Sequence, residues 1–236
     1  MTRIMIAAFL ALSAASASAA ERRYTVTDFD RIQVDGPFQV ALTTGRASSA
    51  MASGSNAAIE RVSIDVQGRT LRVRTNRSAW GGYPGEGTGP VRILLSTNGL
   101  RAASLAGSGR LSIDKARAMR FDASVSGSGR IDVGVIEADT LVVALLGSGK
   151  IMVGGKAKSL RATIQGAGDL DAEALSVEDA QINASTSGLI AVAVRRSATV
   201  TSSGQGDTKI IGSPACTVKS SGSGQVLCGK SDQSQR

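Results

Sequence analysis

The sequence of 236 residues contains no histidine, and only 3% of its residues are aromatic. Histidine is the commonest general base and a frequent metal ligand, so its absence removes the usual basis of a catalytic or metal centre. Stacking of bases on aromatic rings, the common way to bind single-stranded nucleic acid, is also nearly excluded. We expect no catalytic residues, no metal, no cofactor and no nucleic-acid partner.

Long hydrophobic runs are missing after the first twenty residues, and no later stretch approaches the roughly 18 apolar residues of a membrane-spanning helix. The chain begins with Arg3, an apolar run from Ile4 to Leu12, and small residues that end in Ala17-Ser18-Ala19. This pattern predicts a secretory signal peptide over residues 1–19, cleaved after Ala19 or Ala20. We therefore predict an exported protein in the periplasm, with the cell surface and the extracellular space as alternatives.

The chain without Arg3 carries 26 basic and 19 acidic residues, a net charge of +7. A basic exported protein attracts anionic partners. We expect these to be an acidic polysaccharide, lipopolysaccharide or an envelope protein.

Glycine is abundant, with 28 residues, and much of it recurs in phrases such as "GSGRLSI", "GSGRIDV" and "GSGKIMV". A phosphate-binding glycine loop is needed once, between a strand and a helix, whereas a phrase repeated about every 20 residues marks a solenoid. We interpret the glycines as corners of stacked coils, because glycine allows positive φ and close backbone approach. The corner glycines are Gly109, Gly129, Gly149, Gly168, Gly188, Gly206 and Gly224.

Apolar residues alternate with a period of two around each corner, as in Ile131/Val133 and Leu141/Val143/Leu145. This alternation predicts strands with one buried face. The predicted fold is all-β: a single-chain β-helix (β-solenoid) over residues 107–228, with about 20 residues per coil. Each coil has a strand, a Gly-x-Gly corner, a second strand and a short polar return such as "GVIEAD". A calcium-binding β-roll is the alternative, but Asp169 and Asp207 follow their glycines directly instead of two residues later.

Residues 24–106 lack the glycine marker and predict a less regular β section that caps the stack. "RIQVDGPFQVALTTG" predicts a strand pair around Asp35-Gly36-Pro37, and "RVSIDVQGRTLRVRT" a second pair around Gln67-Gly68. We expect a loop or short helix for "RASSAMASGSNAA" between them, and a polar tail over residues 229–236. In the exposed loop "NRSAWGGYPGEGTGP", Trp80 and Tyr83 either contact a glycan or hold the loop against the solenoid.

The segments "FDRIQVDGPFQV" (29–40) and "LRV" (71–73), followed by the run of "GSG" units, resemble the putative autotransporter adhesin head GIN domain family of bacterial envelope proteins. The resemblance covers roughly residues 29–228. It implies a β-helical fold in an exported bacterial protein and adhesion by analogy of shape, and it supplies no catalytic residues. The chain ends in "CGKSDQSQR" and not in a translocating barrel, which favours a free periplasmic protein.

Two side-chain sets could have specific roles. Cys216 and Cys228 are expected to form a disulfide that holds the last coil, with a pair of buried thiols as the alternative. Arg110, Arg130 and Lys150 directly follow three corner glycines and stack about 4.8 Å apart if the coils are in register. We predict that they form an anion-binding stripe, closed by an ion pair between Lys150 and Asp169. The alternative is an ordinary solvated face.

The sequence therefore predicts a non-enzymatic binding or adhesion module that uses its solenoid faces, including contact with further copies of itself through faces or ends. A polysaccharide-processing β-helix enzyme is the second hypothesis, because a β-helix can place Asp114, Asp132 and Arg130 on one face. No nucleophile and base can be paired, however. A purely structural envelope protein is the third.

Overall fold

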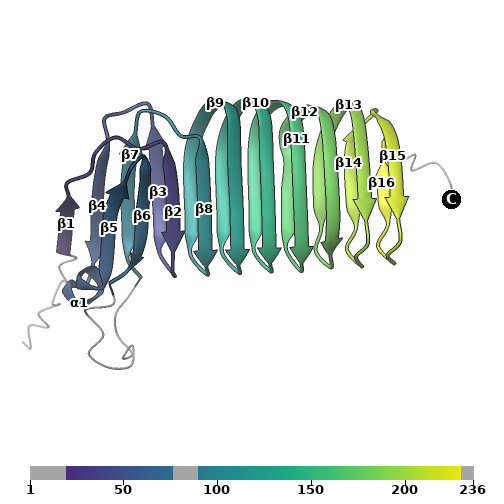
Figure 1. Cartoon of the computed structure of the whole chain (residues 1–236). Coiled ribbons are helices and arrows are strands. Elements are labelled where there is room, and N and C mark those ends of the chain that lie inside the picture. Colours follow the sequence, from purple (N-terminus) through teal and green to yellow (C-terminus); the bar gives the residue numbers. More distant parts are fainter. Residues whose placement is uncertain (1–19, 77–89, 230–236) are drawn as a thin grey trace, which may run out of the picture.

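The computed structural model describes residues 20–76 and 90–229, which form an elongated, nearly all-β body with one five-residue helix (Figure 1). The first half of the described chain has short strands. These elements are β1 (Ala20–Tyr24), β2 (Arg31–Asp35), β3 (Gln39–Thr44), β4 (Ser49–Gly54), α1 (Asn56–Glu60), β5 (Val62–Gln67), β6 (Thr70–Thr75), β7 (Arg92–Thr97) and β8 (Ala102–Gly107).

The repeat region is a β-solenoid, as predicted, and its coils stack along one axis. Its strands are β9 (Arg110–Gly127), β10 (Arg130–Gly147), β11 (Lys150–Gly166), β12 (Asp169–Thr186), β13 (Ile190–Ser202), β14 (Thr208–Gly212), β15 (Ala215–Ser220) and β16 (Val226–Cys228). Neighbouring coils pair in parallel, for example with Ile131 opposite both Leu111 and Ile151. The sequence period therefore fixes which side chains become neighbours.

The polar return of each coil differs from the prediction, because it is not a separate loop. β9, β10 and β12 are each 18 residues long and run up one layer, over a bend, and down the other layer (Figure 1). Residues 134–139 lie within β10, and the ladder to β9 continues through Val135 and Glu137. Each of these coils thus has one tight glycine corner and one continuous bend, whereas the last coil is interrupted between Gly212 and Ala215.

The corner glycines lie in a column in which each approaches the corner one coil earlier. A Cβ on Gly149 would lie 2.5 Å from the carbonyl oxygen of Gly129, which is closer than real Cβ atoms come to backbone. The glycine two residues before it, Gly147, has a φ of +113°, a conformation that side chains strongly disfavour. Glycine is therefore required at this corner both for space and for backbone conformation.

The core is a narrow aliphatic interior between the two layers. In the repeat region it is filled mainly by Val, Ile, Leu and Ala, together with Phe121, which is fully buried. The inward rows continue from coil to coil, as in Val143, Ala162, Ile182 and Val200, each opposite the next. Each coil buries its apolar side chains by stacking on its neighbours.

The N-terminal section continues both layers of the solenoid. β2 pairs with β6 and β8 in one layer, and β3 pairs with β7 and β9 in the other. The prediction that β2 and β3 pair with each other was therefore wrong: the turn at Gly36 carries the chain between layers. β5 and β6 do form an antiparallel pair across Gln67–Gly68, as predicted.

Antiparallel additions close the N-terminal end. β4 pairs with β7, and β1 pairs with β4. The segment expected to be a loop or a short helix contains β4 and the first residues of α1, and α1 contacts β1, β4 and β5. Ser55 caps the helix by accepting a hydrogen bond from the backbone N–H of Ala58.

Candidate functional site

The three predicted stripe residues do stack in register. Arg130 lies opposite Arg110 on one side and Lys150 on the other, at the beginning of β9, β10 and β11. The carboxylate of Asp132, on the same face, lies between the two arginines. Its distances are 2.6 Å to Arg130 Nε and 3.2 Å to Arg110 Nε.

The end of the stripe differs from the prediction. Lys150 Nζ lies 4.0 Å from an Asp171 carboxylate oxygen, whereas Asp169 accepts a hydrogen bond from the backbone N–H of Leu189 at 2.8 Å. Asp169 thus bonds to the corner of the next coil and not to Lys150. An anion that binds at the stripe would compete with the carboxylates of Asp132 and Asp171 for these cations. The stripe should therefore bind anions more weakly than three unpaired cations would.

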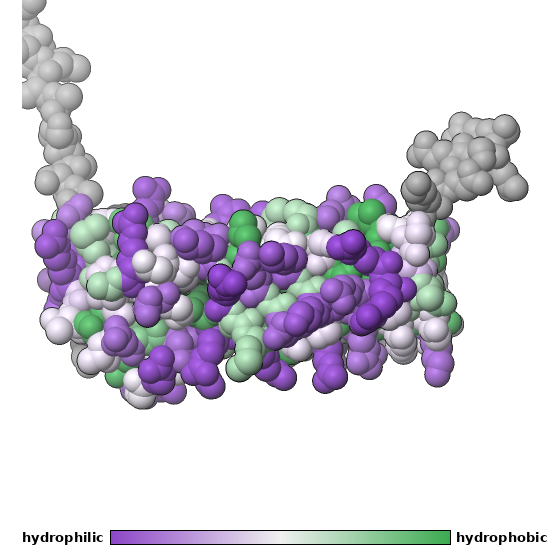
Figure 2. Space-filling model, turned by 90° about the horizontal axis from the view of Figure 1, so that it is seen from above, coloured by the Kyte–Doolittle hydropathy of each residue, from purple (hydrophilic) through white to green (hydrophobic). Residues whose placement is uncertain are grey.

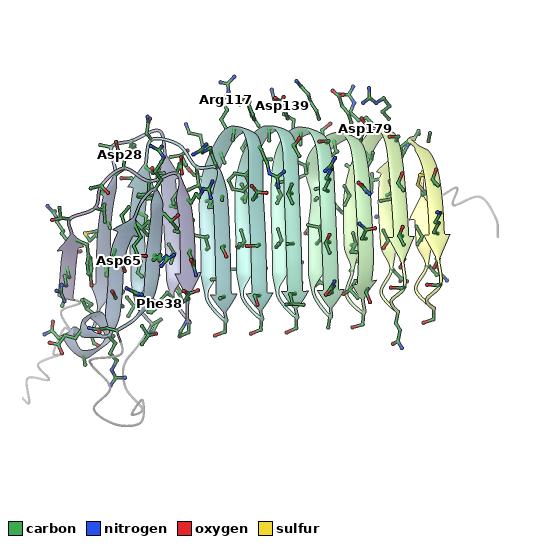
Figure 3. All side chains as sticks on the ribbon, viewed as in Figure 1. Asp28, Phe38, Asp65, Arg117, Asp139 and Asp179 are labelled. Atoms are coloured by element: carbon green, nitrogen blue, oxygen red, sulfur yellow. A yellow bond between two sulfur atoms is a disulfide. The ribbon has the colours of Figure 1, made fainter. Side chains whose placement is uncertain are left out.

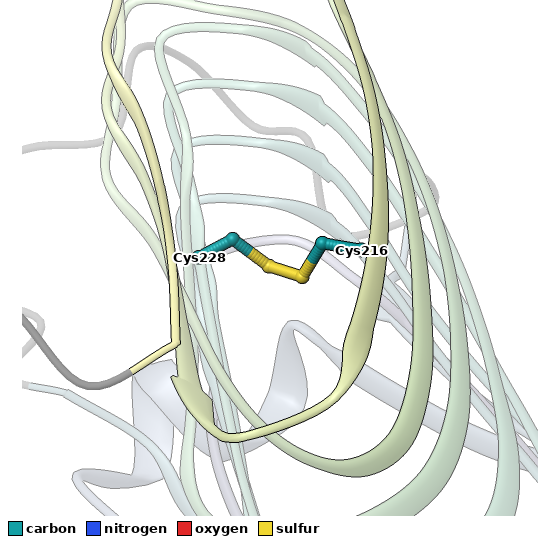
Figure 4. Close-up of a disulfide and its surroundings, with 2 residues drawn as sticks. All are labelled: Cys216 and Cys228. Carbon is teal, nitrogen blue, oxygen red and sulfur yellow. A yellow bond between two sulfur atoms is a disulfide. The ribbon is translucent and has the colours of Figure 1, made fainter.

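The other predicted residues have separate positions. Trp80 and Tyr83 lie outside the described residues. Cys216 on β15 and Cys228 on β16 form a disulfide with a Cα–Cα distance of 6.6 Å, and Figure 4 shows it crossing the space between the two strands. Cys216 is exposed although its neighbour Ala198 is buried, because no described coil covers the last one.

A surface hollow lies on the bend side of the solenoid, which the sequence analysis had treated only as a polar return. We call it the bend groove. It has a volume of about 530 Å³ and spans β9 to β13. It is lined by Arg117, Ala118, Met119, Glu137, Ala138, Asp139, Lys156, Ala157, Lys158, Ser176, Glu178 and Arg195.

The floor of the bend groove is a row of small side chains. Ala118, Ala138 and Ala157 lie opposite one another on β9, β10 and β11. Figure 2, which looks onto this surface, shows paler residues between rows of hydrophilic side chains. Alanine at these positions leaves room for a ligand along the solenoid axis, since larger side chains here would fill the hollow.

The rims of the bend groove carry charges that alternate in sign from coil to coil. On one rim, Glu137 lies between Arg117 and Lys156, at 3.5 Å and 3.4 Å. On the other, Lys158 Nζ lies 2.7 Å from an Asp139 carboxylate oxygen, and this hydrogen bond raises the pKa of Lys158. Arg117 and Asp139 point outward along this edge in Figure 3. Arg117, Lys156 and Lys158 each have a carboxylate neighbour, so an anion in the groove, as at the stripe, would share these cations with carboxylates.

One end of the bend groove is marked by a close ionic cluster. Asp179 accepts hydrogen bonds from Arg196 Nε at 2.9 Å and from Ser197 Oγ at 2.6 Å. These bonds lower the pKa of Asp179 to about 2, which keeps it ionised. At this end of the groove the register between β12 and β13 shifts between Ala172 and Ser176, because β13 has fewer residues in its bend than β12.

The sequence contained a signal for the groove that was missed. Arg117 and Glu137 are 20 residues apart, as are Ala118 and Ala138. The same periodic comparison that found the stripe would have found these rows, had it been applied to the return segments. Within residues 20–76 and 90–229, no three Asp, Glu, Cys or His side chains gather as metal ligands would. The described part of the chain also has no helix of the length and apolarity that crossing a membrane requires.

Comparison with known proteins identifies relatives of the whole fold. The family model "Putative auto-transporter adhesin, head GIN domain" matches residues 28–214. A search of curated proteins found no match.

Solved structures share the fold at low sequence identity. A putative adhesin from Bacteroides fragilis is 20% identical, with a TM-score of 0.82, over 90% of this chain and 97% of its own. A putative lipid binding protein from Parabacteroides distasonis is 20% identical, with a TM-score of 0.71, over 89% and 97%. A putative adhesin from Parabacteroides merdae is 18% identical, with a TM-score of 0.69, over 89% and 96%.

Proposed function

Because the chain belongs to the putative auto-transporter adhesin, head GIN domain family, we propose that it is an exported, non-enzymatic binding module that holds an envelope polymer in its bend groove. The ligand class is an acidic glycan, either a polysaccharide or the sugar-phosphate part of lipopolysaccharide. The observation that carries the proposal is the groove itself: a hollow along the stacking axis, with a floor of alanines and charged rims.

The geometry favours a linear ligand. The groove crosses successive coils, and neighbouring coils present side chains of alternating charge at equivalent positions about 4.8 Å apart. A polymer that lies along the axis would meet Arg117, Lys156 and Lys158 as donors to its acidic groups. Glu137 and Asp139 would accept hydrogen bonds from its hydroxyl or amino groups. The alternating signs suit a glycan that carries both kinds of group better than a uniform polyanion.

The net charge supports an anionic partner at longer range. Residues 20–106 hold 11 basic and 7 acidic residues, whereas residues 107–229 hold 13 and 11. The excess positive charge therefore lies mostly outside the repeats. It would attract an acidic polymer to the molecule, and the groove would supply the local contacts.

The experiment compares two triple variants of the chain from residue 20 onward that remove the same charge. The bend variant is Arg117→Ser, Lys156→Ser and Lys158→Ser, and the stripe variant is Arg110→Ser, Arg130→Ser and Lys150→Ser. Binding to immobilised acidic polysaccharide and to lipopolysaccharide is measured at two salt concentrations. The bend variant is expected to bind about tenfold more weakly, and the stripe variant to stay close to the unaltered protein.

Other outcomes separate the alternatives. Loss of binding in the stripe variant alone would move the site to the predicted stripe. Absence of binding in the unaltered protein would remove the glycan proposal and leave a structural envelope protein. Cleavage of any acidic polysaccharide, tested with and without calcium, would contradict the non-enzymatic assignment. Fractionation of the producing cells tests export.

A further inference from the structure

The two ends of the solenoid are closed in different ways. At the N-terminal end, β1 forms the edge of one layer with three exposed charged residues, Glu21, Arg22 and Arg23. β5 forms the edge of the other layer, where its inward residues Val62 and Ile64 are buried, and α1 packs beside both strands. Charged residues on an edge strand discourage pairing with another chain. The N-terminal end thus has the protection that solenoids and sheets need against edge-to-edge association.

The C-terminal end has less of this protection in the described chain, because β15 carries one charged residue, Lys219, and the helix lies at the other end. β15 pairs with β13 alone, and β16 pairs with β14 alone. All six residues of β15 are exposed. The outer backbone groups of both strands therefore lack a strand partner among residues 20–76 and 90–229.

Apolar side chains that belong to the interior are exposed at this end. Val218 continues the inward row below Val200, yet its exposed fraction is 42% and that of Val200 is 0%. Val226 continues the inward row from Thr208 and is half-buried. Burying these side chains would require one more layer of strands on the stack.

The last coil is also nearly uncharged. Lys219 is the single charged side chain among residues 213–229, and it lies opposite Thr201 on the outward face. The following residues, 230–236, contain no apolar side chain that could cover Val218. The disulfide holds β15 and β16 together, so the edge is already ordered for pairing.

We propose that the C-terminal coil is a homodimer interface, in which β15 pairs antiparallel with β15 of a second copy. The N-terminal end is charged and covered, so head-to-tail stacking has no complementary surface. The C-terminal end can meet only its own equivalent, which gives a closed two-fold dimer and not a fibre. A two-fold axis normal to the layers places β15 beside β15 of the second copy, and β16 beside β16. The inward side chains, including Val218 of both copies, would then form one continuous core.

The size of the end predicts a modest affinity. Six residues of strand span about 20 Å, and two layers about 10 Å apart are roughly 20 Å thick with their outward side chains, which makes an end of on the order of 400 Å² for each copy. The total of about 800 Å² is below the standard size of specific interfaces and in the range of weak, transient ones, so a dissociation constant in the micromolar range is expected. This inference concerns a different surface from the bend groove and does not rest on the proposed function.

The test measures mass and amide exchange of the chain from residue 20 onward under non-reducing conditions. Sedimentation from about 1 to about 200 µM is expected to show a monomer becoming a dimer. Val218→Lys is expected to raise the dissociation constant at least about tenfold, because two charges would face each other. Thr201→Lys, which adds the same charge on an outward face, is the control and should leave the dimer intact.

Hydrogen exchange keeps the test decisive if Val218→Lys disturbs folding. In the unaltered protein, β15 amides should exchange slowly at high concentration and quickly on dilution, while β9–β12 stay protected throughout. A monomer at every concentration overturns the proposal, as does a dimer that survives Val218→Lys with β9–β12 protected. Slow, concentration-independent exchange of β15 would mean that the chain covers its own end, which also overturns it.

Discussion

At the scale of single residues, Asp30 shows how a buried charge organises the N-terminal section. It is 5% exposed, and its carboxylate accepts hydrogen bonds from Arg69 Nε at 2.7 Å and from the Arg101 guanidinium. Its backbone oxygen accepts a further bond from the Arg101 N–H at 2.7 Å. Burial alone would raise the pKa of Asp30, but the two arginines outweigh it and hold the pKa below its usual value.

We predict that Asp30→Asn lowers the free energy of unfolding by about 2 kcal/mol at neutral pH, because charged hydrogen bonds are lost in a buried place. Since the folded-state pKa is lowered, Asp30 stabilises the fold above about pH 4, and this contribution disappears as the pH falls through the folded-state pKa. Thermal unfolding between pH 7 and pH 3 measures it. The variant should lose less stability than the unaltered protein on acidification, while the exposed Asp28→Asn should behave like the unaltered protein.

The corner glycines give a second prediction at this scale. Gly149→Ala is expected to destabilise the solenoid by about 2 to 3 kcal/mol, because the new methyl group would press on the Gly129 carbonyl oxygen and on Val125. Gly99→Ala is the matched control, since a Cβ there would meet nothing within 4 Å. Denaturant unfolding of both variants decides the point, and equal stability of the two would contradict the close packing of the corner.

At the scale of elements, the last coil depends on a disulfide, whereas the middle coils are held by neighbours on both sides. It has a neighbour on one side only, and the Cys216–Cys228 bond closes a loop with a sequence separation of 12. A loop of this size restricts the unfolded chain by about 3 kcal/mol in the chain-entropy model.

Reduction of the disulfide is therefore expected to speed amide exchange in β15 and β16 while β9–β12 remain protected. Hydrogen exchange with and without reductant measures this, and a Cys216→Ala, Cys228→Ala variant should match the reduced protein. Equal protection of β15 in both states would show that stacking on β13 alone holds the coil.

The sequence pattern predicted the solenoid elements well, because alternation and period are local features. Register follows from a 20-residue spacing, so the stacking of Arg110 on Arg130 was predictable. The pairing of β2 with β6 and β8 was not, since no local pattern specifies a partner so distant along the chain. The ion pairs of the stripe were missed because Asp132 pairs with Arg130, two residues away on the same strand, and also with Arg110 on the neighbouring coil.

At the scale of the whole molecule, the solenoid is modular. β9 and β11 are both in register with β10 over nearly their whole length, and Lys150 occupies the position of Arg130 and Arg110. Nearest-neighbour stacking supplies most of the stability of such arrays, so one whole unit can be removed without loss of the pattern.

We predict that deletion of residues 130–149 gives a shorter, cooperatively folded solenoid, because it removes one period and lets Lys150 stack on Arg110. Deletion of the ten residues 130–139 should prevent folding of the following coils, since it places bend residues against corner residues. Circular dichroism and small-angle scattering distinguish these outcomes. Similar disruption by both deletions would argue against independent coils.

The parallel ladder has a mechanical consequence. Its backbone hydrogen bonds run along the long axis, so tension applied between the two ends pulls coils apart one at a time instead of shearing all of them together. Each coil that peels away would release about 20 residues, or roughly 70 Å of extended chain. The bond between Cys216 and Cys228 would spare the residues between them from this lengthening. Under a steady pull, the molecule would extend in steps and dissipate work at each one.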